Sequence, residues 1–122
     1  MNGKIDFGQF ISEQRIKRSI KSQELAEKIG ISTAYLSQLE HGVRVNPAAD
    51  LIFRIAKSLD LNPQESTKLY DLYAKSSGQI SPDIAVYITE NVIVQQAIRQ
   101  ARDANATKED WKNFIEQLKN EQ

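Results

Sequence analysis

Cysteine is absent from the 122-residue sequence, and proline, tryptophan and histidine occur only three times, once and once. The absence of cysteine excludes a disulfide framework and thiolate chemistry, and it suits a reducing cytosol. No apolar run approaches the length of a membrane span, and the first residues lack the apolar stretch of a signal peptide. We therefore expect a cytoplasmic protein with no membrane association.

The residue patterns that commonly carry catalysis are also missing. The sequence contains neither a glycine-rich phosphate loop nor a His-Glu-x-x-His pattern on a helix. The single histidine, His41, has no carboxylate or thiol company at ligand spacing, which is typical of a turn residue and not of a metal site. We predict that the chain is not an enzyme and has no catalytic residue, metal site or cofactor.

Neither sign of charge is in excess, because the formal net charge is zero. Residues 1–60 hold nine basic and seven acidic side chains, whereas residues 61–122 hold seven basic and nine acidic ones. This slight asymmetry permits a basic face towards nucleic acid in the first half and an acidic, partner-facing second half, but it demands neither.

The stretch 22–40 has the apolar spacing of two short helices joined by a tight corner. Its first helix has an apolar stripe at i, i+1 and i+4, formed by Leu25, Ala26 and Ile29. Gly30 follows this stripe, where a helix commonly ends with positive φ, and Ser32 is a good N-cap for the next helix. Leu36 and Leu39 supply the inner face of that second helix. The pattern predicts a helix-turn-helix, although an αα-hairpin that only packs a core fits the spacing equally well.

The outward face of the second helix favours the first interpretation. It carries short or amide-bearing side chains without acidic charge, namely Thr33, Ala34, Ser37 and Gln38. A merely solvated helix face would more often carry glutamate and lysine. Two longer matches point the same way, since the stretches 22–32 and 35–42, followed by Asn-Pro at 46–47, resemble the phage-repressor and Cro type of helix-turn-helix, the xenobiotic-response-element (XRE) family. The resemblance covers residues 7 to 61.

This resemblance implies a role for each matching position. It implies that base edges are read by Thr33, Ala34, Ser37 and Gln38. The amide of Gln38 can form a bidentate pair with adenine, while the methyl groups of Thr33 and Ala34 can meet a thymine methyl. The implied contacts to the DNA backbone are Ser22, Ser32, Tyr35, Arg44 and Asn46. An Arg15–Glu40 ion pair is implied as structural support for the second helix and not as a DNA contact.

Two of these positions have a second interpretation as helix caps. Ser22 can act as the N-cap of the first helix of the motif as well as touch a phosphate. Asn46 can contact the backbone of DNA, or it can serve only as an N-cap with Pro47 at the first helical position. Both roles are compatible at each position.

The remaining periodicity predicts an all-α fold of five helices in residues 1–78, followed by a three-helix segment in residues 79–122. A first helix over 6–19 has a core stripe of Phe7, Phe10 and Ile11, with Ile16 and Ile20 leading into the next helix, and a fourth is expected over 47–59. The fifth starts at Asn62-Pro63-Gln64-Glu65 and ends near Gly78. In the last segment we expect three helices. One starts at Ser81-Pro82, the next covers 91–103, and the last follows a capping box at Thr107.

The last three helices are strongly amphipathic and too short to bury their own apolar faces. We predict that they pair with the same segment of a second chain, through Ile93, Ile98, Trp111, Phe114, Ile115 and Leu118. In the alternative, they pack back onto their own first domain and leave a monomer. One recognition helix covers few base pairs, so the geometry of DNA sites favours the homodimer.

The sequence therefore predicts a sequence-specific regulator of transcription that binds double-stranded DNA. A dimeric repressor of a palindromic operator, of the phage or mobile-element kind, is the expectation that the resemblance implies. The alternative is a protein-interaction module, such as an antitoxin, or a repressor whose tail is the target of a regulatory metallopeptidase. A regulatory protease or an antirepressor is the protein partner that these alternatives imply.

Overall fold

The computed structural model describes residues 5–43 and 46–121, and every regular element in these ranges is an α-helix. In chain order the helices are α1 (Phe7–Lys17), α2 (Ser22–Ile29), α3 (Thr33–Glu40), α4 (Ala49–Ser58), α5 (Pro63–Ser77), α6 (Pro82–Thr89), α7 (Val92–Asp103) and α8 (Lys108–Asn120). The predicted all-α fold of five helices followed by three is therefore confirmed. The chain separates into two units, Met1–Ala85 and Val86–Gln122, with the boundary inside α6.

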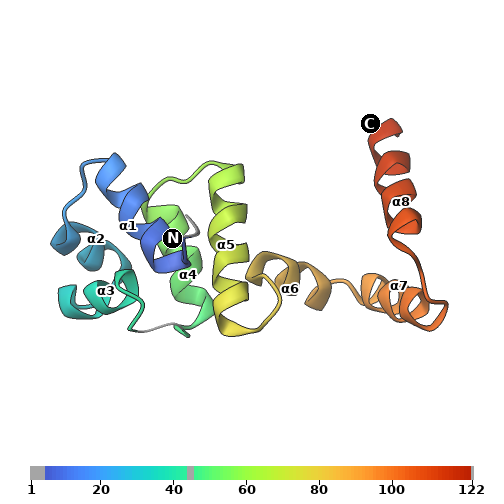
Figure 1. Ribbon diagram of the computed structural model, residues 1–122, viewed down its shortest axis with the longest axis horizontal. Helices are drawn as coiled ribbons and strands as arrows, with labels where there is room; N and C mark the ends of the chain where they lie inside the picture. The colour runs from blue at the N-terminus through green and yellow to red at the C-terminus, as the bar shows by residue number, and fades with distance from the viewer. Residues whose placement is uncertain (1–4, 44–45, 122) are drawn as a thin grey trace. The chain divides into compact units, whose positions relative to one another are not determined.

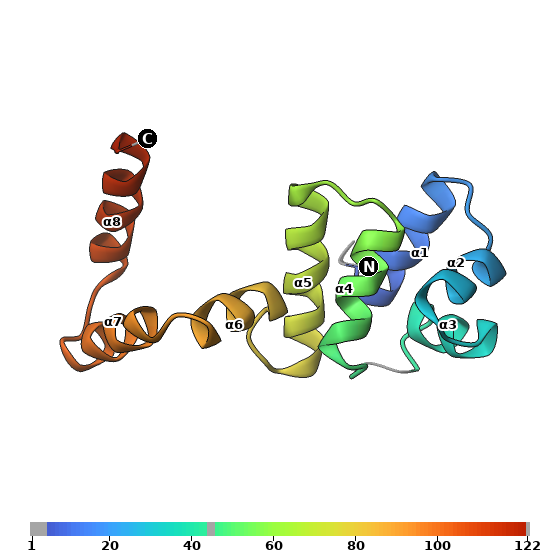
Figure 2. The same ribbon diagram turned by 180° about the vertical axis from the view of Figure 1, so that it is seen from behind.

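Helices α1 to α5 pack around one another within the first unit. Helix α1 contacts α3 and α5, helix α2 contacts α3 and α4, and α4 contacts α5. Both views show α1 and α4 lying between the α2–α3 pair and α5 (Figures 1 and 2). This arrangement leaves the outer side of α2 and α3 uncovered by the other helices of the unit.

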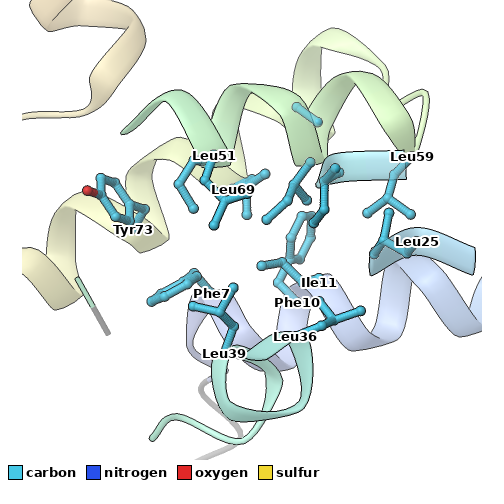
Figure 3. Close-up of a cluster of buried hydrophobic side chains, with 14 of the residues drawn as sticks. Phe7, Phe10, Ile11, Leu25, Leu36, Leu39, Leu51, Leu59, Leu69 and Tyr73 are labelled. Atoms are coloured by element: carbon cyan, nitrogen blue, oxygen red, sulfur yellow. The ribbon is translucent and has the colours of Figure 1, made fainter. Parts of the chain in front are cut away.

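The hydrophobic core of the first unit takes side chains from all five helices, and Figure 3 shows many of them converging. The buried apolar residues of the described part are Phe7, Phe10, Ile11, Leu25, Ala26, Ile29, Leu36, Leu39, Leu51, Ile52, Ile55, Ala56, Leu59, Leu69 and Tyr73. The stripes predicted for the helix-turn-helix are thus buried. The predicted stripe of the first helix, Phe7, Phe10 and Ile11, is buried too, whereas Ile16 is 63% exposed.

Local caps set most helix boundaries. Asn62 and Glu65 form a reciprocal capping box at the start of α5, and Thr107 and Asp110 form another at the start of α8. Gly78 ends α5 in the left-handed conformation with φ of +73°. The predicted capping box at Thr107 and the predicted end of α5 are both confirmed.

The second unit contains the end of α6 together with α7 and α8, and it has little core of its own. None of the described residues of α7 or α8 is buried, although both helices carry large apolar side chains. In the ranges that the structure describes, no helix combines the length and the apolar character needed to cross a membrane.

Candidate nucleic-acid interface

The α2–turn–α3 segment forms through local backbone geometry. Gly30 ends α2 with φ of +78°, a left-handed conformation that glycine adopts without steric cost. Ser32 then caps α3, because its hydroxyl accepts a hydrogen bond from the Tyr35 N–H at 3.0 Å. The turn predicted from Gly30 and Ser32 is therefore present, and it sets the direction in which α3 leaves α2.

Helix α3 turns its apolar side chains inward and its polar ones outward. Leu36 and Leu39 are fully buried, whereas Thr33, Ala34 and Ser37 are exposed. Gln38 is half-buried at the margin of the same surface. We call the surface formed by Thr33, Ala34, Ser37 and Gln38 the outer face of α3. It presents hydrogen-bonding groups and methyl groups without a charged side chain.

The acidic side chain of α3, Glu40, is withdrawn from this surface. Its side chain is only 5% exposed, and both carboxylate oxygens are bound by Arg15 of α1. The Arg15 Nε–Glu40 Oε2 distance is 2.8 Å and the Nη2–Oε1 distance is 3.0 Å, so the pair is bidentate. The remaining Nη1 donates to the Ile20 carbonyl oxygen at 2.9 Å. This pair links α1, the α1–α2 loop and the end of α3.

The hydrogen bond to Glu40 is also the main reason why the pKa of Arg15 is raised above its ordinary value. The carboxylate stabilises the guanidinium by direct hydrogen bonding and by charge, which together outweigh the loss of hydration. The geometry of the predicted Arg15–Glu40 pair is thus present. Because Arg15 holds Glu40 away from the surface, the outer face of α3 presents no negative charge.

Helix α1 and the end of α3 touch backbone to backbone at Gly8. A Cβ atom built at Gly8 would lie 2.1 Å from the Leu39 carbonyl oxygen and 3.0 Å from the Glu40 carbonyl oxygen. No side chain fits there unless one of the helices moves. Sequence reasoning missed this contact because Gly8 and Leu39 are far apart in the chain. The only available signal was a glycine inside a helix.

The residues expected to contact the DNA backbone lie in different settings. Ser32 is exposed and its hydroxyl serves the cap, while Tyr35 is half-buried against the core. Arg44 lies outside the described residues. The structure contradicts the interpretation of Ser22 and of Asn46 as N-caps.

Ser22 is not the N-cap of α2, because it is already the first helical residue. The N-cap is Lys21, whose extended backbone places its carbonyl oxygen 3.0 Å from the Leu25 N–H. No side-chain hydrogen bond caps this helix. The half-buried Ser22 hydroxyl lies at the N-terminus of α2, beside backbone N–H groups that favour anions.

Asn46 is exposed and is not an N-cap either. Helix α4 begins at Ala49, with Ala48 as its N-cap. Pro47 is buried, and its carbonyl oxygen accepts a hydrogen bond from the Tyr73 hydroxyl of α5. The backbone is extended at Ala48, so the helix starts later than the sequence predicted.

Arg54 of α4 supports the motif from behind, and sequence reasoning did not identify it. Its Nη1 donates to the Ile29 carbonyl oxygen at the end of α2, and its Nε lies 3.1 Å from Asp50 Oδ2. The guanidinium therefore satisfies one of the carbonyl groups that a helix end leaves unpaired. It joins α4 to the turn that precedes α3.

The residues predicted for dimerisation lie on the apolar faces of α7 and α8 and are between 41% and 73% exposed. Most of them line an open groove of about 470 Å³ within the second unit. The groove is lined by Tyr87, Ile93, Val94, Ala97, Ile98, Trp111, Phe114 and Leu118.

The described residues contain no group of three or more side chains suited to hold a metal ion. His41 lies at the end of α3 with its ring Nδ1 2.8 Å from the Ser37 carbonyl oxygen. The site is thus a surface of hydrogen-bonding side chains on one short helix, braced by Arg15, Gly8 and Arg54.

Comparison with known proteins agrees with this geometry. A helix-turn-helix family model matches residues 11–66. The "Uncharacterized HTH-type transcriptional regulator Rv0474" of Mycobacterium tuberculosis is 34% identical over 76% of this chain, which spans 61% of that protein. The ImmF control region 10 kDa protein of Bacillus phage phi105 is 36% identical over 51% of this chain and 70% of its own length.

One chain in a solved structure of the SinR protein/SinI protein complex aligns with 93% of this chain over 94% of its own length, with 23% identity and a TM-score of 0.49. The prediction that the chain is not an enzyme agrees with the mycobacterial relative, which is named a transcriptional regulator. The family match, the sequence identity and the α2–turn–α3 geometry lead to one assignment. The chain belongs to the XRE-type helix-turn-helix family of transcriptional regulators.

Proposed function

We propose that this chain represses transcription in the cytoplasm by binding a palindromic operator in double-stranded DNA as a homodimer. The outer face of each α3 would enter the major groove in successive turns of the duplex. Residues 1–78 would bind DNA and residues 79–122 would hold the two copies together. A dimer bound over a promoter would exclude RNA polymerase, and operators of the phage or mobile-element kind are the proposed targets.

One observation carries this proposal: the outer face of α3 is polar and exposed while the acidic group of the helix is buried on Arg15. A carboxylate at this surface would repel phosphates and oppose entry into the groove. The exposed groups instead match base edges, since an amide can pair with adenine and methyl groups can meet thymine. Phosphate contacts would add affinity that weakens as salt rises.

Selection of bound sites from a random duplex DNA pool tests the proposal. The wild-type chain is expected to enrich a two-fold symmetric sequence, and Gln38→Ala is expected to lose discrimination at one position of each half-site. A good bidentate contact is worth about 1–3 kcal/mol of discrimination against the wrong base. Gln64→Ala is the matched control, because Gln64 is an exposed residue of α5. Unchanged selectivity of Gln38→Ala would mean that another face of the motif reads the DNA.

The apolar groove of α7 and α8 favours a second candidate, a protein-interaction module of the antitoxin kind or a repressor whose tail a regulatory metallopeptidase cleaves. Five of the six predicted dimerisation residues line this groove and are exposed, so the groove is open to a partner helix as well as to a second copy. The two candidates differ in the selection experiment. A chain that enriches no DNA sequence yet binds a protease or an antirepressor tightly would be an interaction module.

A further inference from the structure

The end of α2 is closed by backbone hydrogen bonds and by a side chain from another helix. The Ile31 N–H donates to the Ala26 carbonyl oxygen at 3.0 Å, and Gly30 between them has φ of +78°. This is the backbone arrangement of the Schellman motif, which does not use the Ile29 carbonyl oxygen. That oxygen instead accepts a hydrogen bond from Nη1 of Arg54, on α4. A donor outside the motif therefore completes the turn that leads to α3.

The Arg54 guanidinium lies against this turn and is itself held in place. A Cβ atom built on Gly30 would lie 3.3 Å from Arg54 Nη1, so the guanidinium occupies the space beside the glycine. Arg54 Nε lies 3.1 Å from Asp50 Oδ2, four residues earlier on α4. Its nitrogens thus bind groups on two different helices, in the fixed geometry of a planar guanidinium. Its positive charge also complements the negative end of the α2 dipole.

The two ends of α3 are held by different arginines. At the carboxyl end, Arg15 of α1 binds both carboxylate oxygens of Glu40. At the amino end, only a short turn separates the Ile29 carbonyl group from Thr33, the first residue of α3. A displacement of the end of α2 would therefore reach the start of α3 directly, while the carboxyl end keeps a separate support.

We infer that Arg54 is a positioning residue for base readout, because its bond to the Ile29 carbonyl oxygen fixes the direction in which α3 leaves α2. The inference rests on the proposed function, since it requires the outer face of α3 to read bases. Recognition side chains must be held to within about 0.5 Å of their working position. Without Arg54 the turn would loosen and misplace Thr33 and Ala34 first. The other end of the outer face would keep its place, because α1 holds the carboxyl end of α3 independently.

Base discrimination at the two ends of the outer face tests the inference. Selection from a random duplex pool with Thr33→Ser, which removes only a methyl group, and with Gln38→Ala identifies the base position that each end reads. Arg54→Met is then expected to lose discrimination at the Thr33 position by about tenfold, within the range that one wrong base pair costs, and to keep it at the Gln38 position. Arg54→Lys keeps the charge and a donor, so it should lie between Arg54→Met and the wild type.

Lys57→Met is the matched control, because it removes one positive charge from another exposed residue of α4. It is expected to discriminate between bases as the wild type does. The Arg54 side chain is 47% exposed and lies outside the core, so Arg54→Met should fold. Thermal unfolding followed by circular dichroism sets a working temperature at which all variants are native.

Amide hydrogen exchange in the free protein gives a second readout, which does not depend on DNA. The Ile31 N–H closes the turn, so it is expected to exchange severalfold faster in Arg54→Met than in the wild type. The Leu25 N–H, which is 3.0 Å from the Lys21 carbonyl oxygen at the start of α2, is expected to keep its rate. A general loss of stability would instead raise the exchange rates of both amides.

Three results would overturn the positioning role. The first is unchanged discrimination in Arg54→Met, and the second is an unchanged exchange rate of the Ile31 N–H. The third is an equal loss of affinity for all DNA sequences, with the slope of log K against log salt smaller in magnitude by about 1, which would make Arg54 a phosphate contact. Each of these leaves the proposed function intact, whereas absence of any DNA binding by the wild type would overturn both.

Discussion

The position of α3 depends on a few single residues that bring its carboxyl end against α1. Arg15 and Glu40 are 13% and 5% exposed in their side chains and form a bidentate pair between the two helices. Two charges withdrawn from water gain from their attraction only while both partners remain, because a single buried charge keeps its desolvation cost. The pair therefore acts as a specific link between helices and is costly to break from one side.

Replacing one member of this pair should be strongly destabilising. We expect Glu40→Ala to lower the free energy of unfolding by about 3–5 kcal/mol, because it leaves the Arg15 guanidinium without its carboxylate. Urea denaturation followed by circular dichroism measures this change, and Glu27→Ala, at an exposed residue of α2, is the control. The double variant Arg15→Met/Glu40→Met should be less destabilised than the sum of its single variants. Additive effects would show that the pair does not couple the helices.

Gly8 makes the tightest contact between α1 and α3, and adding one methyl group tests it. A Cβ at this position meets the Leu39 carbonyl oxygen at 2.1 Å, and this oxygen belongs to backbone and cannot rotate away. We expect Gly8→Ala to destabilise the chain by about 1–3 kcal/mol through overpacking. The opposing gain in helix propensity is about 1 kcal/mol. Glu13→Ala in the same helix is the control, and a higher melting temperature for Gly8→Ala would contradict the observed contact.

The start of α5 shows how one element is stabilised by both caps and charges. The Glu65 carboxylate accepts a hydrogen bond from the Asn62 N–H at 2.9 Å and another from Arg18, the C-cap of α1, at 3.0 Å. Lys17 adds a longer ion pair at 3.6 Å. The Asn62 hydrogen bond, followed by the charge of Arg18, lowers the pKa of Glu65 below its ordinary value. A cap at one helix start therefore also joins α5 to the end of α1.

The lowered pKa of Glu65 predicts how stability changes in acid. A carboxyl group whose pKa is lower in the folded state contributes stability above its unfolded pKa, near 4.3 for glutamate, and loses that contribution as the pH falls through the folded pKa. We expect the wild type to lose stability below about pH 4.3 more steeply than Glu65→Gln. Urea denaturation between pH 6 and pH 3 measures both slopes, with Glu109→Gln on α8 as the control. Parallel curves for wild type and Glu65→Gln would exclude this origin of the acid sensitivity.

Helix boundaries could be predicted from the sequence where they depend on contacts between residues close together in the chain. Gly30 and Gly78 end helices, and Asn62 and Thr107 begin them, because these caps involve residues only a few positions apart. Ile16 is exposed because the stripe that starts at Phe7 continues at i+3, i+4 and i+7, and Ile16 lies off that line. Pro47 lies before α4 and accepts a hydrogen bond from Tyr73 of α5, a contact between residues far apart in the chain that local sequence does not reveal.

Some of the tertiary contacts that hold the candidate site in place could be predicted from the sequence, and others could not. The ion pair of Arg15 with Glu40 could be predicted because the family resemblance supplied the partner, and the outer face of α3 followed from helical spacing. The contacts of Gly8 with Leu39 and of Arg54 with Ile29 could not be predicted, since they depend on how whole helices approach one another. The assignment of individual side chains to bases or phosphates stays a prediction.

The whole molecule combines a unit with a well-filled core and a unit whose apolar side chains are exposed. In the first unit the apolar faces of five helices cover one another, whereas α7 and α8 expose residues such as Ile93 and Trp111. Exposed apolar surface of this kind is costly in water and is typical of an interaction site. If a second copy covers it, binding to two half-sites becomes linked, because the second site is engaged at high effective concentration.

A charge placed in the groove should separate the copies without unfolding either one. Phe114 of α8 is 49% exposed and lines the groove, while its exposed neighbour Asn113 does not line it. If the proposed dimer forms through this groove, Phe114→Glu is expected to shift it towards monomer in sedimentation velocity, because a carboxylate would have to be buried in the apolar interface. Asn113→Glu adds the same charge and should remain dimeric.

The same pair of variants links assembly to DNA binding. Phe114→Glu should bind a palindromic operator about 10²-fold or more weakly, yet bind a single half-site as the wild type does, because only the linkage between half-sites is lost. Gel-shift titrations with the full and the half operator measure both affinities. A wild type that sediments as a monomer at 100-fold above its operator Kd, or a Phe114→Glu variant that remains dimeric, would show that this groove serves another partner.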